Sequence, residues 1–185
     1  MSEQLTVTIK RFKPEQKGES YLETFKIPAA EAEGMTILNA LKYIQENLDP
    51  TLAFYHSCEL ARCRGCVVEV KRKIVFACTE PFKDGLTVEP VSNLPLIRDL
   101  VVKFIDSRVI VDQELCNGCK ACIKRCPMDV YEMAANGKVV VVRDGAVDGF
   151  TGKGDMVDCI GCRKCEQGCP TGAIQIVPLD GPAVV

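Results

Sequence analysis

Twelve cysteines in 185 residues constrain this chain more than any other feature. They fall into three groups of four with none left over: Cys58, Cys63, Cys66 and Cys78; Cys116, Cys119, Cys122 and Cys126; and Cys159, Cys162, Cys165 and Cys169. Three four-coordinate sites predict complete groups of four, whereas a disulfide framework does not require them. The chain starts MSEQLTVTIKRFK, with no apolar run behind a basic segment, so no export signal is indicated. We therefore expect a cytoplasmic protein whose cysteines bind metal.

The composition is that of an ordinary globular protein, with 47% hydrophobic and 26% charged residues. No apolar run approaches the length of a membrane-spanning helix, so we expect any membrane association to come through partners. The formal net charge of -2 and the lack of a basic face argue against nucleic-acid binding.

The second and third groups lie in the segments CNGCKACIKRCP and CIGCRKCEQGCP. Each has the C-x2-C-x2-C-x3-C-P spacing of bacterial ferredoxins, in which three close cysteines offer sulfurs to one face of a cubane cluster. Pro127 and Pro170 fix the backbone after the fourth cysteine. We expect Gly118 and Gly161 to let backbone N–H groups approach the cluster sulfurs. Zinc is the alternative, because C-x2-C pairs also bind zinc.

The chain around these two motifs also repeats, with Val111-Asp112 and Val157-Asp158 ahead of each and a short apolar strand after each. Residues 106–185 therefore resemble the two-cluster 4Fe-4S ferredoxin domain. That resemblance implies that the two halves exchange their fourth ligands. One 4Fe-4S cluster would take Cys116, Cys119, Cys122 and Cys169, and the other Cys159, Cys162, Cys165 and Cys126. The segment between the halves is longer than in a minimal ferredoxin and predicts a strand, KVVVV, and a glycine-rich loop.

The first group has a different spacing, C-x4-C-x2-C, which is the plant-type pattern for a 2Fe-2S cluster with a fourth ligand from elsewhere. Cys78 is the candidate, because VVEVKRKIVFA alternates apolar and polar residues about the turn at Lys71, Arg72 and Lys73. This pattern predicts a hairpin that returns Cys78 to the loop. A 4Fe-4S cluster at this group is the alternative.

Upstream, LTVTIKRF and SYLETFKI have strand periodicity. Thr36 can cap a helix, ILNALKYIQENL, that ends at Asp49-Pro50. Two strands, a packed helix, a cluster loop and a returning hairpin describe a β-grasp ferredoxin domain. We therefore predict an α+β protein, with a β-grasp iron–sulfur domain at 1–105 and a dicluster ferredoxin domain at 106–185.

The segments MTILNALKYIQENLDPTLAFYHSC and VEPVSNLPLIRDLVV, with the first cysteine group between them, make residues 1–105 resemble the iron–sulfur subunit of the succinate dehydrogenase and fumarate reductase family. The resemblance implies that Cys58, Cys63, Cys66 and Cys78 hold a 2Fe-2S cluster and that the domain docks against a flavoprotein. Ala61 stands where that family usually has glycine, so we expect a slightly reshaped loop. The family's second domain carries a 3Fe-4S cluster and a tryptophan used in quinone binding. This chain has a complete last group and no tryptophan, which argues against direct quinone reduction.

These features predict a non-catalytic electron-transfer subunit of an oxidoreductase complex. It would relay single electrons through one 2Fe-2S and two 4Fe-4S clusters, between a catalytic flavoprotein and a second redox partner. The alternatives are a subunit of a tungsten or molybdenum enzyme, a free polyferredoxin and, in a different class, a zinc-binding interaction module.

Overall fold

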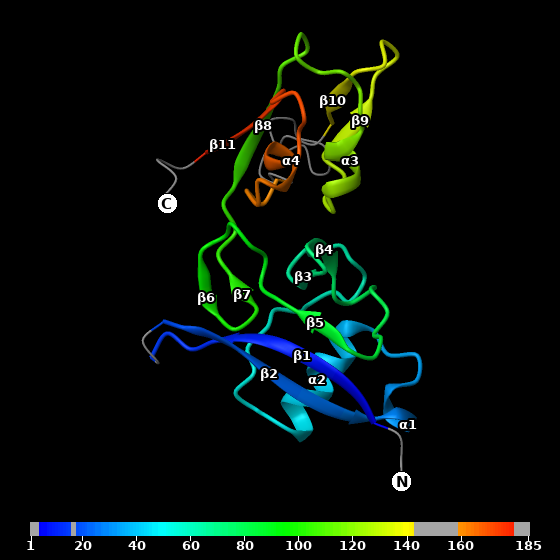
Figure 1. Ribbon diagram of the computed structural model, residues 1–185, viewed down its shortest axis with the longest axis vertical. Helices are drawn as coiled ribbons and strands as arrows, with labels where there is room; N and C mark the ends of the chain where they lie inside the picture. Colours follow the sequence, from blue (N-terminus) through cyan, green and yellow to red (C-terminus); the bar gives the residue numbers. More distant parts are fainter. Residues whose placement is uncertain (1–3, 16–17, 143–158, 180–185) are drawn as a thin grey trace. The chain divides into compact units, whose positions relative to one another are not determined.

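The computed structural model describes residues 4–15, 18–142 and 159–179. The chain divides into two compact units, Met1–Lys103 and Phe104–Val185 (Figure 1). The sequence places the boundary after Ile105. All twelve cysteines lie in the described residues, four in the first unit and eight in the second.

The first unit is built on a three-stranded sheet with the order β2-β1-β5 (Figure 1). Strand β1 (Gln4–Phe12) pairs antiparallel with β2 (Ser20–Pro28) and parallel with β5 (Leu86–Val88). A single helical turn, α1 (Ala29–Ala32), follows β2. The two strands predicted from periodicity are thus confirmed, and they meet in one hairpin.

Helix α2 (Ile37–Asn47) packs its apolar side against this sheet. It begins at the predicted cap, where Thr36 Oγ1 accepts the N–H of Asn39 at 3.3 Å. The apolar spacing buries one side of the helix, including Ile37, Leu38, Leu41 and Ile44. Each such side chain contributes about 1.5–3 kcal/mol when fully buried, so the sheet and helix share the main core of this unit.

The predicted hairpin after the first cysteine loop is confirmed as β3 (Val67–Val70) paired antiparallel with β4 (Lys73–Phe76). Lys71 and Arg72 form its exposed turn with φ values of 49° and 66°. Glu69 is buried in spite of its charge, because Ser92 donates to its carboxylate from the backbone N–H at 3.0 Å and from the hydroxyl at 2.8 Å.

A buried ion-pair network fastens β1 to the segments that carry the first cysteine loop. The Arg11 side chain has no exposed surface, and its Nε donates to the buried Asp99 carboxylate at 2.9 Å. Asp99 lies between two short strands, β6 (Leu96–Arg98) and β7 (Val101–Val102), and also accepts the Ala53 N–H at 2.9 Å. Arg11 donates to Asp49 at 2.6 Å, and although burial opposes ionisation, this hydrogen bond lowers the pKa of Asp49 to about 2.

In its described residues, the second unit interleaves four strands with two short helices. Its elements are β8 (Ser107–Val111), α3 (Ala121–Arg125), β9 (Tyr131–Met133), β10 (Val139–Val141), α4 (Lys164–Gln167) and β11 (Ile174–Pro178). Strand β8, before the first motif, pairs antiparallel with β11, after the second, and β9 pairs with β10. The strand predicted from KVVVV is confirmed as β10, and the predicted glycine-rich loop lies outside the described residues.

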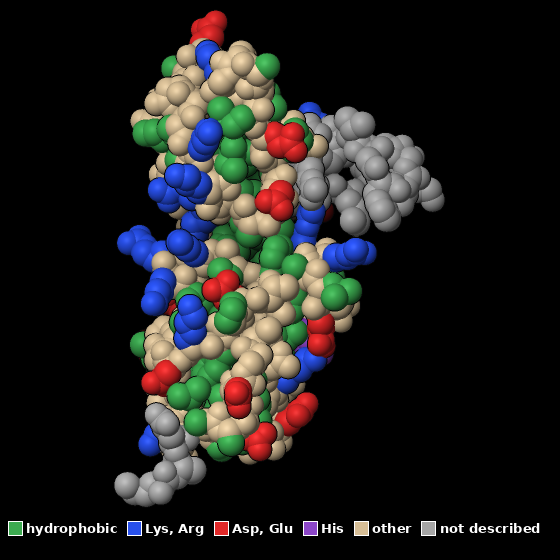
Figure 2. Space-filling model, turned by 90° about the vertical axis from the view of Figure 1, so that its right-hand side faces the viewer, with side chains coloured by type: hydrophobic (Ala, Val, Ile, Leu, Met, Phe, Trp, Pro, Cys, Tyr) green, Lys and Arg blue, Asp and Glu red, His purple; other side chains and the backbone are tan. Residues whose placement is uncertain are grey.

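Both units mix strands with a few short helices, which confirms the α+β prediction. The β-grasp assignment of the first unit stays a prediction. On the face of the first unit seen in Figure 2, acidic and basic side chains are interspersed with hydrophobic ones. No helix in the described part of the chain has the length and apolar character needed to cross a membrane.

Candidate metal centres

The first cysteine loop points several backbone N–H groups at one sulfur. The Sγ of Cys58 accepts hydrogen bonds from the N–H groups of Leu60 at 3.4 Å, Arg62 at 3.3 Å and Cys63 at 3.2 Å. Successive N–H groups that converge in this way form a concave site for an anion. These bonds, with that of Leu60 first, lower the pKa of Cys58 to about 7. The loop is therefore organised around a thiolate.

The same loop holds a strained backbone. Glu59, Ala61 and Arg64 have φ values of 56°, 56° and 58°, which lie in the left-handed region that residues other than glycine rarely adopt. At Ala61 this conformation directs the backbone N–H toward Cys78 Sγ, which accepts it at 3.3 Å. The position where the resembling family usually has glycine is therefore one where this chain adopts a glycine-like conformation.

The hairpin brings the fourth cysteine of this group back beside the loop. The N–H of Ala77 donates to the carbonyl of Cys66 at 2.9 Å, which places the end of β4 next to the start of β3. Cys66 and Cys78 are buried, whereas Cys63 is exposed. Burial raises the pKa of Cys66 to about 11, so its proton must be displaced when metal binds.

His56 lies on the surface beside this loop. Its side chain is 39% exposed, and Nδ1 lies 4.0 Å from the Glu59 carboxylate. Its ring is tilted against that of Phe54, with 5.6 Å between the ring centroids.

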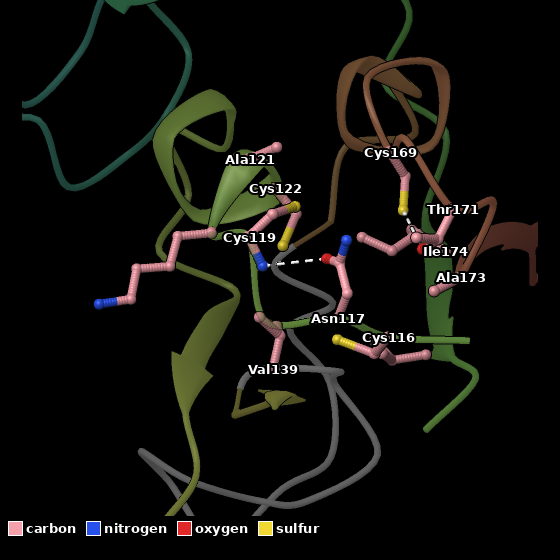
Figure 3. Close-up of a pocket in the computed structure, with 12 residues that line it drawn as sticks. Cys116, Asn117, Cys119, Ala121, Cys122, Val139, Cys169, Thr171, Ala173 and Ile174 are labelled. Atoms are coloured by element: carbon pink, nitrogen blue, oxygen red, sulfur yellow. Dashed lines mark hydrogen bonds between the residues drawn. The ribbon is translucent and has the colours of Figure 1, made fainter. Parts of the chain in front are cut away.

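In the second unit, one pocket gathers cysteines from both motifs. Cys116, Cys119, Cys122 and Cys169 line it, and it contains about 290 Å³ of space free of protein atoms, part of it open to solvent. Figure 3 shows Cys119 just before α3 and Cys122 in its first turn, with Cys169 across from them and Cys116 lower in the view, toward the side of Cys169. The Oδ1 of Asn117 accepts the N–H of Cys119 at 3.2 Å and so shapes the loop.

A second pocket has the reciprocal arrangement. Cys159, Cys162 and Cys165 of the last motif line it together with Cys126 of the preceding one. This pocket contains about 320 Å³ of space free of protein atoms, again partly open. The rest of its lining is mainly apolar and includes Met128, Val130 and Ile160, which limits the access of water to the thiols.

Helix α3 connects the two pockets. Cys122 lies within the helix and faces the first pocket, while Cys126 follows its last residue and lines the second. The N–H of Cys126 donates to the carbonyl of Cys122 at 3.0 Å. Helices α3 and α4 pack together, so the two pockets are neighbours within this unit.

Burial raises the pKa of four thiols in the second unit, those of Cys122, Cys159, Cys162 and Cys165. Burial raises the pKa of Cys122 and Cys162 to about 11 and that of Cys159 to about 12. Cys169 is the contrasting case: although burial opposes ionisation, hydrogen bonds led by that of the Thr171 hydroxyl lower its pKa. Iron binds thiolates, so assembly of these sites must release protons.

Two glycines of the motifs prove to be required by packing. Gly161 has a φ of 76°, and a Cβ there would lie 2.7 Å from the carbonyl oxygen of Ile105. Gly118 has a φ of 72° and lies directly against the Gly137 carbonyl, which leaves no space for a side chain. That these glycines admit backbone N–H groups to the cluster stays a prediction, and the structure adds a second reason for glycine, the close backbone contacts at both positions.

The donor set fits iron–sulfur clusters. All twelve cysteines are free thiols, and thiolates are the usual ligands of such clusters. In the described residues, no three His, Cys, Asp or Glu side chains lie close enough together to hold a single metal ion. A cluster is bound through several irons, so its cysteines are distributed around the cluster and not around one ion. A buried hydroxyl without a partner, that of Tyr131, also faces the second pocket.

The comparisons with known proteins bear on both units. Residues 6–111 match the model of the 2Fe-2S iron-sulfur cluster binding domain. The chain belongs to this family. Residues 115–174 match the 4Fe-4S dicluster domain. The prediction of one 2Fe-2S and two 4Fe-4S clusters is therefore confirmed, and the 4Fe-4S alternative for the first group is not supported.

Among curated proteins, the chain is similar to one subunit of a CoM/CoB fumarate reductase from Methanothermobacter marburgensis. The two are 36% identical over 98 residues, which cover 53% of this chain and 19% of that protein. The fumarate reductase iron–sulfur subunit of Haemophilus influenzae is 35% identical over 109 residues, covering 56% of this chain and 42% of that one. These matches confirm the family resemblance.

A third relative is an uncharacterized iron–sulfur protein of Methanococcus maripaludis. It is 24% identical over 209 aligned residues, which cover 89% of this chain and 40% of that protein. The chain thus spans less than half the length of each of these three relatives.

Two hydroxyl groups beside the cysteines were not singled out from the sequence. Thr171 lies 3.6 Å from Cys169 Sγ in the first pocket, and Tyr131 lines the second. Alignment of the two motif repeats provides a signal for Tyr131, because the fifth residue after the last cysteine is Tyr131 in one repeat and Ile174 in the other.

Proposed function

We propose that this chain is the electron-transfer subunit of an oxidoreductase complex, relaying single electrons through three iron–sulfur clusters. Cys58, Cys63, Cys66 and Cys78 hold the 2Fe-2S cluster. One 4Fe-4S cluster is held by Cys116, Cys119, Cys122 and Cys169, and the other by Cys159, Cys162, Cys165 and Cys126. The first cluster belongs to a β-grasp domain at 1–105 and the other two to a dicluster domain at 106–185.

The observation that carries this proposal is the composition of the two pockets in the second unit. Each is lined by three cysteines of one motif and the last cysteine of the other. Reciprocal lining of this kind supports the exchange of fourth ligands that two-cluster ferredoxins use. It also supports placing two redox centres close enough to exchange electrons within one unit.

The bound clusters supply one-electron chemistry at potentials between about -700 and +450 mV. The chain's own residues hold the irons, exclude water and stabilise negative charge. In the first unit, the backbone N–H groups that donate to Cys58 and Cys78 stabilise the negative charge. In the second unit the mainly apolar lining of the Cys159 pocket limits the access of water to the cluster site.

The partner at one end of the relay is a catalytic flavoprotein, by analogy with the fumarate reductases to which the chain is similar. A second redox protein donates or accepts electrons at the other end. The first cysteine loop supports an electron exit at the surface of the first unit, because Cys63 and Arg62 are exposed there.

Anaerobic isolation from the native source, followed by metal, flavin and sulfide analysis, tests this function. We expect coloured protein with about ten irons per chain, matched by acid-labile sulfide, and a larger flavin-containing subunit that co-elutes. Tungsten or molybdenum in that subunit would replace the flavoprotein as partner. Isolation of the chain alone, with its clusters, would instead identify a free polyferredoxin.

Zinc content without iron or sulfide is the outcome that contradicts electron transfer altogether. Such a colourless protein would be a zinc-binding interaction module. Iron near twelve per chain would place a 4Fe-4S cluster on the first group and would contradict only that assignment.

A further inference from the structure

Tyr131 is the buried polar side chain whose environment the fold leaves unexplained. It begins β9, is 4% exposed and lines the pocket of Cys126, Cys159, Cys162 and Cys165. Within the described residues, its hydroxyl is the buried side-chain polar atom that lacks a hydrogen-bond partner. Leaving such a group unpaired is unfavourable, so an acceptor in the pocket would stabilise this arrangement.

The surroundings of this hydroxyl offer sulfur as the acceptor. Among the side chains that line the pocket, those other than the thiols are apolar, apart from Arg125 and Lys164, which carry positive charge and accept no hydrogen bond. Tyr131 and Cys165 line the same pocket, so the Cys165 sulfur belongs to the surroundings of the phenol. A phenolic O–H is a hydrogen-bond donor and can donate to such a sulfur.

We propose that Tyr131 donates a hydrogen bond to a sulfur of the 4Fe-4S cluster in this pocket and thereby raises its reduction potential. The acceptor is the Cys165 thiolate or an inorganic sulfide of the cluster. This inference rests on the proposed function, which places a cluster here. Reduction adds one electron and makes the sulfurs more negative, so the hydrogen bond is stronger in the reduced state. Its donor thus favours reduction.

The other repeat lacks this donor and uses a different one. Ile174 occupies the position that corresponds to Tyr131, and it lines the pocket of Cys116, Cys119, Cys122 and Cys169. There the hydroxyl of Thr171 lies 3.6 Å from Cys169 Sγ, as Figure 3 shows. The two sites therefore each have one hydroxyl beside a thiol, and removing one should alter one cluster and not the other.

The test is an anaerobic redox titration of the full-length holoprotein, followed by electron paramagnetic resonance, with iron and sulfide measured on each sample. Tyr131→Phe removes one oxygen atom and retains the ring. We expect it to lower the reduction potential of one 4Fe-4S cluster by about 59 mV, which corresponds to a tenfold change in the equilibrium constant for one-electron reduction. Thr171→Val is the matched variant. It should lower the potential of the other 4Fe-4S cluster, so the double variant should show both shifts.

A second substitution keeps the hydroxyl and strengthens it as a donor. Site-specific 3-fluorotyrosine at position 131 makes the phenol more acidic, so the same cluster should shift to a higher potential. Opposite shifts from the two substitutions cannot arise from altered packing alone. If Tyr131→Phe fails to assemble its clusters, the fluorotyrosine protein decides the question by itself.

Unchanged potentials in either protein, with iron and sulfide retained, would overturn the role of Tyr131 and leave the proposed function intact. Absence of 4Fe-4S signals from the wild-type chain is a different result. It would overturn the proposed function, and the tyrosine inference with it.

Discussion

The backbone N–H of Ala61 donates a hydrogen bond to the Sγ of Cys78 at 3.3 Å, which joins the cluster loop to the end of the returning hairpin. This contact depends on the φ of 56° at Ala61, a conformation that costs a residue with a Cβ about 1–2 kcal/mol. The loop therefore keeps this hydrogen bond at the expense of backbone strain.

Ala61→Gly is expected to relieve this strain and to stabilise the first unit by about 1 kcal/mol. Anaerobic thermal loss of the 2Fe-2S absorption band measures the effect, and the variant should lose the band at a higher temperature than the wild type. Ala77→Gly is the control, since Ala77 is buried beside Cys78 without a positive φ and its replacement should destabilise. Earlier loss of the band from Ala61→Gly would contradict the strain argument.

The exchange of fourth ligands can be tested with pairs of cysteine variants. In the proposed assignment, Cys119 and Cys169 serve one cluster, whereas Cys162 and Cys169 serve different clusters. Cys119→Ser with Cys169→Ser should therefore impair one 4Fe-4S cluster, and Cys162→Ser with Cys169→Ser should impair both. Iron, sulfide and electron paramagnetic resonance intensities count the clusters that remain. The reverse result would indicate that each motif holds its own cluster.

Gly161 should not tolerate a side chain. Gly161→Ala places a Cβ 2.7 Å from the Ile105 carbonyl oxygen at a φ of 76°, so both a clash and strain are expected. Gly172→Ala is the matched control, because its φ of 69° imposes the strain but nothing lies within 4 Å of the added Cβ. Gly172→Ala should lower the stability of the second unit by about 1–2 kcal/mol. Gly161→Ala should lower it further, and thermal loss of the 4Fe-4S absorption compares the two variants. Equal losses would show that the close contact relaxes at little cost.

Arg11 should be far more important for stability than an exposed arginine. Arg11→Met leaves the buried Asp99 carboxylate without its cation, which is expected to cost about 3–5 kcal/mol. Arg98→Met removes an exposed pair with Glu15 at 3.2 Å and should cost no more than about 1 kcal/mol. Anaerobic denaturant unfolding of the first unit compares the two. Similar denaturant midpoints for Arg11→Met and Arg98→Met would contradict a large contribution of the buried ion pairs to stability.

Local patterns were sufficient to predict several parts of the fold. Strand periodicity, the Thr36 cap and the alternation before Cys78 each predict an element that the structure contains. The sequence also signals the position of Arg11, because alternation places it on the same side of β1 as the buried Val7 and Ile9. Its partners could not be predicted, since Asp99 is distant in sequence and reaches Arg11 only through tertiary packing.

The cysteine spacings predict the kind of cluster, because ligand geometry is encoded within a few residues of each motif. The environment of each cluster is less local. The sequence predicts Tyr131 to be a residue of a short apolar strand. Only the structure shows that its hydroxyl is unpaired, because β9 packs beside the last motif. The burial of Glu69 likewise depends on Ser92, which comes from a different segment.

The most direct test of the central claim is an anaerobic reductive titration of the purified holoprotein with dithionite, counting the electrons accepted per chain. We expect one electron for each of the three clusters, with 2Fe-2S and 4Fe-4S signals appearing in the electron paramagnetic resonance spectrum as the titration proceeds. A chain that accepts no electrons and gives no such signal would contradict the proposed relay.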